Sequence, residues 1–222
     1  MSTLFKDRKD AGRRLGALLA KRYGGRQDVL VLGLPRGGVP VAYEVARALG
    51  APLDILIVRK LGLPQHKEYA MGAIASGGVT VLDDDIVRGM GVSQQALDAV
   101  VAAEQAELLR REAAYRGDAP ASSLGGRSVI LVDDGLATGS TMRAAIAAAR
   151  HGGPASIIVA APVGAPETCE AIRPQVDDLV CLAQPELFRA VGLWYHDFPQ
   201  TSDREVQELL ARRPLDSLGK LA

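Results

Sequence analysis

The stretch VILVDDGLATGST, residues 129–141, joins a buried-strand pattern to a polar loop. Four branched apolar residues run directly into Asp133 and Asp134, and small and hydroxylated residues follow. A short continuous apolar run of this kind is typical of a strand in a parallel sheet that is covered on both faces. Two neighbouring carboxylates at its end repel each other and lose solvation, so they need a compensating partner.

Apolar runs on both sides of this stretch extend the same pattern. The sequence predicts strands over 29–33, 53–58, 129–132, 157–163 and 179–182. It predicts helices between them, over 39–49, about 140–151 and 166–172. Because strands that alternate with helices build parallel sheets, we expect an α/β fold with a doubly wound, mostly parallel sheet flanked by helices. Such sheets bind ligands at the carboxyl ends of their strands.

Two central segments depart from this alternation. Residues 59–82 are expected to form a long loop that includes a short hairpin, and such loops often serve as active-site lids. Residues 93–116 are expected to form an Ala-rich helix whose charges make a solvated face. We interpret the acids between them as a helix N-cap: Asp83, Asp84 and Asp85.

The tail, residues 184–210, concentrates the aromatic side chains Phe188, Trp194, Tyr195 and Phe198. These rings either pack the tail onto the core, which we favour, or stack on a planar acceptor. No repeat or linker marks a boundary, so we expect a single domain over residues 1–222 with a core of about 28–182. Candidates for a small hood or insert are 83–116, 184–222 and the N-terminal helix.

The composition is that of an ordinary globular protein, with 48% hydrophobic and 23% charged residues among 222. Lys plus Arg and Asp plus Glu each number 26, and a net charge of zero argues against a general nucleic-acid binder. We expect Cys169 and Cys181 to be buried reduced thiols and the three scattered histidines to bind no zinc. A charged N-terminal stretch and the lack of an apolar run of about 18 residues predict a cytoplasmic protein without a membrane span.

Residues 135–141 lie between a predicted strand and a predicted helix, where backbone N–H groups and a helix N-terminus form an anion site. The hydroxyls of Thr138, Ser140 and Thr141 add donors, and no Lys precedes them as in a Walker A loop. A purely structural turn is the alternative. The adjacent acids can accept hydrogen bonds from two neighbouring hydroxyls or hold a divalent cation, so a phosphorylated ribose satisfies both halves of the motif.

The stretch 129–141 resembles the phosphoribosyl pyrophosphate (PRPP) motif of type I phosphoribosyltransferases. The resemblance implies that Asp133 and Asp134 hold the ribose hydroxyls and that the loop holds the 5-phosphate. The implied PRPP-binding residues are Asp133, Asp134, Gly135, Ala137, Thr138, Gly139, Ser140 and Thr141.

The segment GLPRGG, residues 33–38, resembles the pyrophosphate loop of the same family, with Pro35, Arg36, Gly37 and Gly38 as the implied binding residues. By itself it is also typical of a tight turn. Residues 59–82 are similar to the mobile catalytic loop of the family. Arg59, Lys60 and Lys67 are therefore candidates for binding the leaving pyrophosphate, with a solvated loop edge as the alternative.

The two ends of the chain, residues 5–12 and 188–198, resemble a bacterial group of uncharacterised phosphoribosyltransferases. The resemblance implies an Mg²⁺-dependent glycosyltransferase (a pentosyltransferase) of nucleotide metabolism that displaces pyrophosphate at the ribose anomeric carbon. The acceptor is unidentified, and we expect a nitrogen heterocycle. The implied catalytic residues are Arg36, Arg59, Lys60, Lys67, Asp133 and Asp134. The two acids would hold Mg²⁺ directly or through water or ligand, and the chain is compatible with a homodimer.

Two alternatives to this enzyme stay open. A regulatory protein could keep the PRPP site without catalysing transfer, although zero net charge without a basic cluster disfavours a nucleic-acid regulator. Another nucleotide-binding α/β enzyme could use GLPRGG as its main loop. That segment lacks the spacing G-x-G-x-x-G, and such an enzyme leaves Asp133 and Asp134 without a role.

Overall fold

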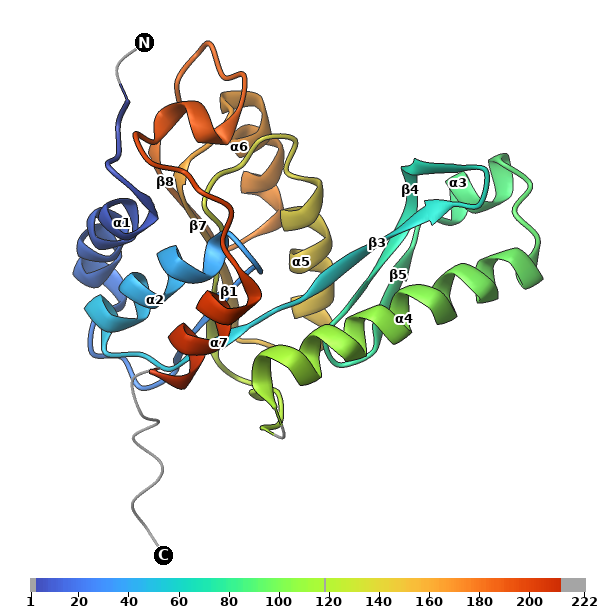
Figure 1. Ribbon diagram of the computed structural model, residues 1–222, viewed down its shortest axis with the longest axis horizontal. Helices are drawn as coiled ribbons and strands as arrows, with labels where there is room; N and C mark the ends of the chain where they lie inside the picture. Colours follow the sequence, from blue (N-terminus) through green and yellow to red (C-terminus); the bar gives the residue numbers. More distant parts are fainter. Residues whose placement is uncertain (1–2, 118, 213–222) are drawn as a thin grey trace, which may run out of the picture.

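The computed structural model describes residues 3–117 and 119–212 and contains a five-stranded parallel sheet at its centre (Figure 1). The strand order is β2-β1-β6-β7-β8, and every neighbouring pair is parallel. The strands are β1 (Val29–Gly33), β2 (Leu53–Ile55), β6 (Ser128–Val132), β7 (Ser156–Val163) and β8 (Asp178–Ala183). The predicted doubly wound α/β fold is confirmed.

Helices cover both faces of this sheet. On one face lie α1 (Arg8–Tyr23), α2 (Gly38–Leu49) and α7 (Asp203–Ala211), and on the other α5 (Ser140–His151) and α6 (Pro166–Ile172). In β1, side chains on both faces of the sheet are apolar: Val31 packs in the cluster with α1 and α2, whereas Leu30 packs with α5. Because both faces are buried, the central strands are mostly apolar rather than alternating.

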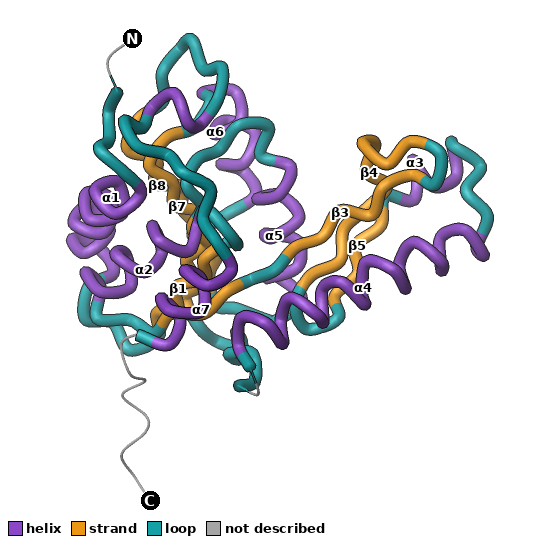
Figure 2. The backbone as a smooth tube through the Cα atoms, viewed as in Figure 1, coloured by secondary structure: helices purple, strands orange, loops and turns teal. Residues whose placement is uncertain are grey.

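Residues 58–116 form an arm that projects from the core (Figures 1 and 2). It contains an antiparallel sheet of β3 (Val58–Leu63), β4 (His66–Ala75) and β5 (Val79–Leu82), followed by α3 (Asp84–Gly89) and α4 (Gln94–Arg116). The expectation of a long loop with a short hairpin is thus corrected to three paired strands. The strand predicted over 53–58 also ends early, at Ile55, and Val58 opens β3.

The arm sheet is stabilised by apolar contacts with α4. Leu61 and Met71 are fully buried in one cluster with Leu97 and Leu108 of that helix. Asp83 caps α3 by accepting a hydrogen bond of 3.0 Å from the Ile86 amide, which confirms the predicted N-cap. The C-terminal end of α4 contacts the core through Arg116, which pairs with Asp54 of β2 at 2.9 Å.

The N-terminal segment and the tail meet beside the sheet. The amides of His196 and Asp197 donate to the carbonyls of Phe5 and Lys6 at 2.8 and 2.9 Å. The rings of Phe5 and Tyr195 lie 5.4 Å apart, centre to centre, in a buried cluster with Trp194. The preference for packing over stacking on a ligand is therefore confirmed for Trp194 and Tyr195.

Further short elements are the 3-10 helices η1 (Arg173–Gln175) and η2 (Val191–Trp194). Both cysteines are free thiols, but only Cys169 is buried; Cys181 is partly exposed, contrary to the expectation of two buried thiols. None of the helices in residues 3–117 and 119–212 combines the length and the apolar character needed to cross a bilayer.

Candidate functional site

Two loops lie side by side because the strands that precede them are neighbours. Gly33 at the end of β1 pairs with Val132 at the end of β6. The glycine loop (residues 34–38) therefore contacts the acids that follow β6. A Cβ atom on Gly37 would overlap the carboxylate of Asp134, so this approach requires glycine. The structure thus brings together the residues of the two predicted donor-binding motifs.

The phosphate loop (residues 135–141) is held by its carbonyl groups. Thr168 Oγ1 donates to the Ala137 carbonyl at 2.5 Å, and Arg143 Nη2 donates to the Thr138 carbonyl at 2.7 Å. The amides of Ala137, Thr138 and Gly139 donate to no residue within the part of the chain that the structure describes. These N–H groups are therefore free to bind an anion.

The N-terminus of α5 adds to this candidate anion site. Gly139 caps the helix with a φ of 70°, a left-handed conformation that favours glycine. The first turn of α5 contains no acid, so the positive end of the helix dipole is uncompensated. The loop encloses a pocket of about 120 Å³, lined by Asp133, Gly135, Leu136, Ala137, Thr138, Gly139, Ser140, Thr141 and Met142.

The acid pair has a cationic partner within the chain. Arg8 Nε donates to Asp134 Oδ2 at 2.8 Å, and the Asp134 amide donates to Asp133 Oδ1 at 2.9 Å. Burial raises the pKa of Asp133 well above its usual range, and the charge of Asp134 raises it further. Burial also raises the pKa of Asp134, and Arg8 opposes that rise. The sequence did not identify Arg8 as a partner of the acids.

Asp133→Asn is expected to raise the melting temperature at pH 7, because burial and the charge of Asp134 disfavour the ionised carboxyl in the folded protein. A carboxyl whose pKa is raised on folding contributes stability at low pH that is lost as the pH rises through the folded-state pKa. The gain should therefore shrink toward pH 4, as calorimetry at several pH values would show. The exposed Asp85→Asn is the control, and an unchanged or lower melting temperature for Asp133→Asn at pH 7 would contradict the expectation.

The predicted bases do not all face the two loops. Arg36 Nη1 lies 3.6 Å from Asp203 Oδ1 of α7, and the same oxygen accepts a hydrogen bond of 2.6 Å from Tyr115. Arg59 Nε donates to Glu104 of α4 at 2.7 Å. Lys60 points to the opposite face of the arm sheet because side chains alternate along a strand. Lys67 belongs to β4, and its side chain lies outside what the structure describes.

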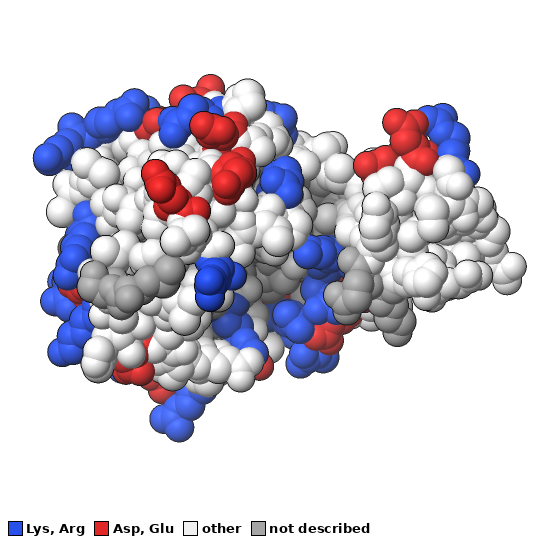
Figure 3. Space-filling model, turned by 90° about the horizontal axis from the view of Figure 1, so that it is seen from above, with Lys and Arg blue, Asp and Glu red and all other residues white. Residues whose placement is uncertain are grey.

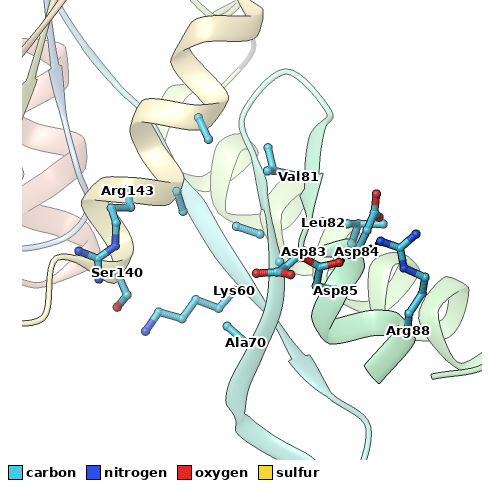
Figure 4. Close-up of a pocket in the computed structure, with 14 residues that line it drawn as sticks. Lys60, Ala70, Val81, Leu82, Asp83, Asp84, Asp85, Arg88, Ser140 and Arg143 are labelled. Atoms are coloured by element: carbon cyan, nitrogen blue, oxygen red, sulfur yellow. Dashed lines mark hydrogen bonds and ion pairs between the residues drawn. The ribbon is translucent and has the colours of Figure 1, made fainter. Parts of the chain in front are cut away.

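A cleft of about 630 Å³ lies between the arm and α5. Lys60 reaches from β3 toward Ser140 and Arg143 at the start of α5 (Figure 4). Basic side chains gather along the hollow between core and arm (Figure 3). Since Ser140 lines both this cleft and the pocket of the phosphate loop, Lys60 is placed on the same side of the molecule as the anion site.

Three residues of the site carried no assignment from the sequence. Arg143 lies in the first turn after the phosphate loop, where a basic residue is a usable signal for an anion site. Arg8 lies in the segment 5–12, which the family resemblance singled out without a role. Thr168 gave no signal, because its contact with Ala137 joins residues far apart in the chain.

A parallel sheet whose central strand ends in two acids and a loop of small and hydroxylated residues is typical of phosphoribosyltransferases. The chain belongs to this family: the family described as "Phosphoribosyl transferase domain" matches residues 4–193.

Among individual relatives, the chain is 49% identical over 213 residues to the protein named "Putative phosphoribosyl transferase Rv0571c" of Mycobacterium tuberculosis. The match covers 96% of this chain and 48% of that protein, so the chain spans about half the length of this relative. The crystal structure of the protein TT1426 from Thermus thermophilus superposes with a TM-score of 0.83 at 42% identity, covering 93% of this chain and 97% of that one.

Proposed function

We propose that this protein transfers the 5-phosphoribosyl group of PRPP to a nitrogen heterocycle and releases pyrophosphate. The observation that carries the proposal is the position of Asp133 and Asp134 between the glycine loop and a phosphate loop whose amides at residues 137–139 donate to no residue that the structure describes. PRPP has the matching order of groups: a 5-phosphate, two vicinal hydroxyls and a pyrophosphate. Its 5-phosphate suits the 120 Å³ pocket, and its pyrophosphate would lie toward the glycine loop.

Each part of the site has a role in this proposal. The amides of the phosphate loop bind the 5-phosphate, and the two acids accept hydrogen bonds from the ribose hydroxyls. Pro35, Arg36, Gly37 and Gly38 line the binding site of the leaving pyrophosphate. Lys60 rather than Arg59 is available to neutralise the charge of the donor, because Glu104 holds Arg59 on the other face of the arm sheet.

Positive charge develops on the ribose ring as pyrophosphate departs. The carboxylates of Asp133 and Asp134 stabilise that charge electrostatically, and they act in a partly buried site where such interactions are strong. Neither acid is assigned as a general base, because that role depends on the acceptor.

The acid pair also fits Mg²⁺. No group of three or more His, Cys, Asp or Glu residues within residues 3–117 and 119–212 could hold a metal ion alone. Mg²⁺ commonly keeps several waters and binds through one or two carboxylates together with substrate phosphates, which matches this donor set. Asp133 and Asp134 would hold the ion through water or through the donor. When bound, Mg²⁺ supplies charge neutralisation for the leaving pyrophosphate.

The tail and the start of α1, which both lie next to the acids, are proposed to form the hood that selects the acceptor. The tail packs directly on the phosphate loop, since a Cβ atom on Gly135 would lie 2.5 Å from Val191 Cγ1. The start of α1 reaches the acids through Arg8. The segment 83–116, also a candidate for the hood or for an insert, contains α3 and α4 of the arm.

Calorimetry with Mg·PRPP tests the proposal. We expect binding by the wild type and at least about tenfold weaker binding by Asp134→Asn, since a charged hydrogen-bond acceptor is lost. Asp98→Asn, at an exposed carboxylate of α4, is the matched control and should bind like the wild type. Unchanged affinity in Asp134→Asn would overturn the ribose assignment.

A pyrophosphate-release assay against a panel of purines, pyrimidines and other nitrogen heterocycles separates the enzyme from the regulatory alternative. Release with one of them supports transfer. Binding of PRPP without release for any acceptor would overturn the transfer proposal in favour of a regulatory protein.

A further inference from the structure

Arg8 is fixed in the site by contacts that do not involve the acids. It lies in the first turn of α1, which Asp7 caps by accepting a hydrogen bond from the Asp10 amide. Its Nη1 donates to the Pro199 carbonyl at 2.6 Å. Its guanidinium carbon lies 3.7 Å from the centre of the Phe198 ring, within the range of a cation–π interaction.

These contacts make Arg8 a preorganised part of the hood. Its side chain is only 11% exposed, and that of Asp134 is 15% exposed. The planar guanidinium donates to the tail through Nη1 and to Asp134 through Nε. A lysine ammonium could not make both hydrogen bonds with this geometry. The position of Arg8 is thus set by the tail, and Arg8 in turn can set the position of Asp134.

Asp134 is constrained on several sides. Its Oδ2 accepts from Arg8 and lies against Gly37, and its carbonyl accepts a hydrogen bond of 2.6 Å from Tyr195. Its Oδ1 accepts no hydrogen bond from any residue that the structure describes. Oδ2 therefore fixes the orientation of the carboxylate through Arg8, and Oδ1 is available to a ligand.

We propose that Arg8 is a positioning residue for the donor: it holds Asp134 so that Oδ1 faces the ribose, and it links the tail to the donor site. The proposal rests on the proposed function, because Asp134 needs this orientation only if it binds ribose. A second effect acts in the same direction. The donor is highly anionic, and Arg8 offsets part of the negative charge of the acid pair beside it.

Calorimetry with Mg·PRPP tests the assignment. We expect Arg8→Met to weaken binding at least about tenfold, and Arg8→Lys, which keeps the charge but not the fork, to weaken it about threefold. Arg14→Met is the matched control, since Arg14 lies on the same helix, pairs with Asp10 at 2.8 Å and donates to the Leu4 carbonyl. It should bind within about twofold of the wild type.

A double-mutant cycle separates positioning from a merely structural role. In the Asp134→Asn background, Arg8→Met is expected to weaken binding less than about threefold, because the carboxylate that Arg8 orients is already lost. Circular dichroism must show all variants folded at the temperature of the measurement. If Arg8→Met does not fold, the same cycle is run with Arg8→Lys. Its effect on the affinity for Mg·PRPP should vanish in the Asp134→Asn background.

The outcomes are distinguishable. Equal losses in both backgrounds would overturn the proposal, because Arg8 would then act only by holding the tail. Tighter binding by Arg8→Met would also overturn it, since Arg8 would then compete with the donor for Asp134. If the wild type binds no PRPP, the proposed function fails and the role of Arg8 fails with it. If the wild type binds and Arg8→Met binds equally well, only the role of Arg8 is lost.

Discussion

Asp54→Asn is expected to lower the free energy of unfolding by about 3–5 kcal/mol, the range for breaking one partner of a buried ion pair. Asp54 and Arg116 are only 2% and 6% exposed, and they pair at 2.9 Å. Asp54 also accepts hydrogen bonds of 2.8 Å from the amides of Ile55 and Ser122. The amide of asparagine would face one of these donors with its own N–H group and leave the Arg116 charge with the less buried Glu112, at 2.9 Å, as its remaining counterion among the described residues.

Urea denaturation of both proteins measures this loss. Glu208→Gln is the control, because its ion pair with Arg204 at 2.9 Å is exposed, and such pairs contribute about 0–1 kcal/mol. If Asp54→Asn unfolds within about 1 kcal/mol of the wild type, the view of Asp54 as the anchor between arm and core is wrong. Since Asp54 lies in β2 and Arg116 ends α4, the loss should appear as a less stable base of the arm.

The core of this fold could be predicted because its strands are buried on both faces. Residues 29–33 and 129–132 are apolar without interruption, which is the pattern of a central parallel strand. The arm was not predicted as a sheet for the opposite reason. Its strands are interrupted by Gly62 and Gly72 and lie between α4 and α5, so no regular alternation marks them.

The two motifs of the site could be predicted because each is local. Residues 133–141 and 34–38 carry their acids, glycines and hydroxyls within a few positions, and parallel pairing of β1 with β6 places them together. Arg8 could not be predicted in the same way. It lies 126 positions before Asp134, and only the packing of α1 against the tail brings the two side chains into contact.

Arg59 and Lys60 have different partners because they lie in β3, a strand that the sequence analysis did not predict. In a loop, adjacent basic residues can both turn toward one ligand. In β3 they point to opposite faces, so Arg59 meets Glu104 and Lys60 faces α5. Recognition of β3 from the sequence would have separated their roles.

Gly37→Ala is expected to weaken binding of Mg·PRPP about a hundredfold, which is equivalent to about 2.7 kcal/mol. A methyl group at residue 37 would overlap Asp134 Oδ2, so either the glycine loop or the carboxylate must move. If the carboxylate moves, its ion pair with Arg8 is broken, and if the loop moves, the amides of the pyrophosphate site are displaced. Both responses separate two groups that one donor must contact together, and shifts of about 1 Å can have effects of this size.

Calorimetry with Gly89→Ala provides the comparison, because a Cβ at residue 89 meets no atom within 4 Å and should leave donor binding unchanged. Combining Gly37→Ala with Arg8→Met identifies which group moves. If the carboxylate leaves Arg8, the second substitution adds little to the first, because the ion pair is already broken. If the loop moves, the two losses add. An affinity of Gly37→Ala within about threefold of the wild type would contradict the close approach of the glycine loop to the acids as a requirement for donor binding.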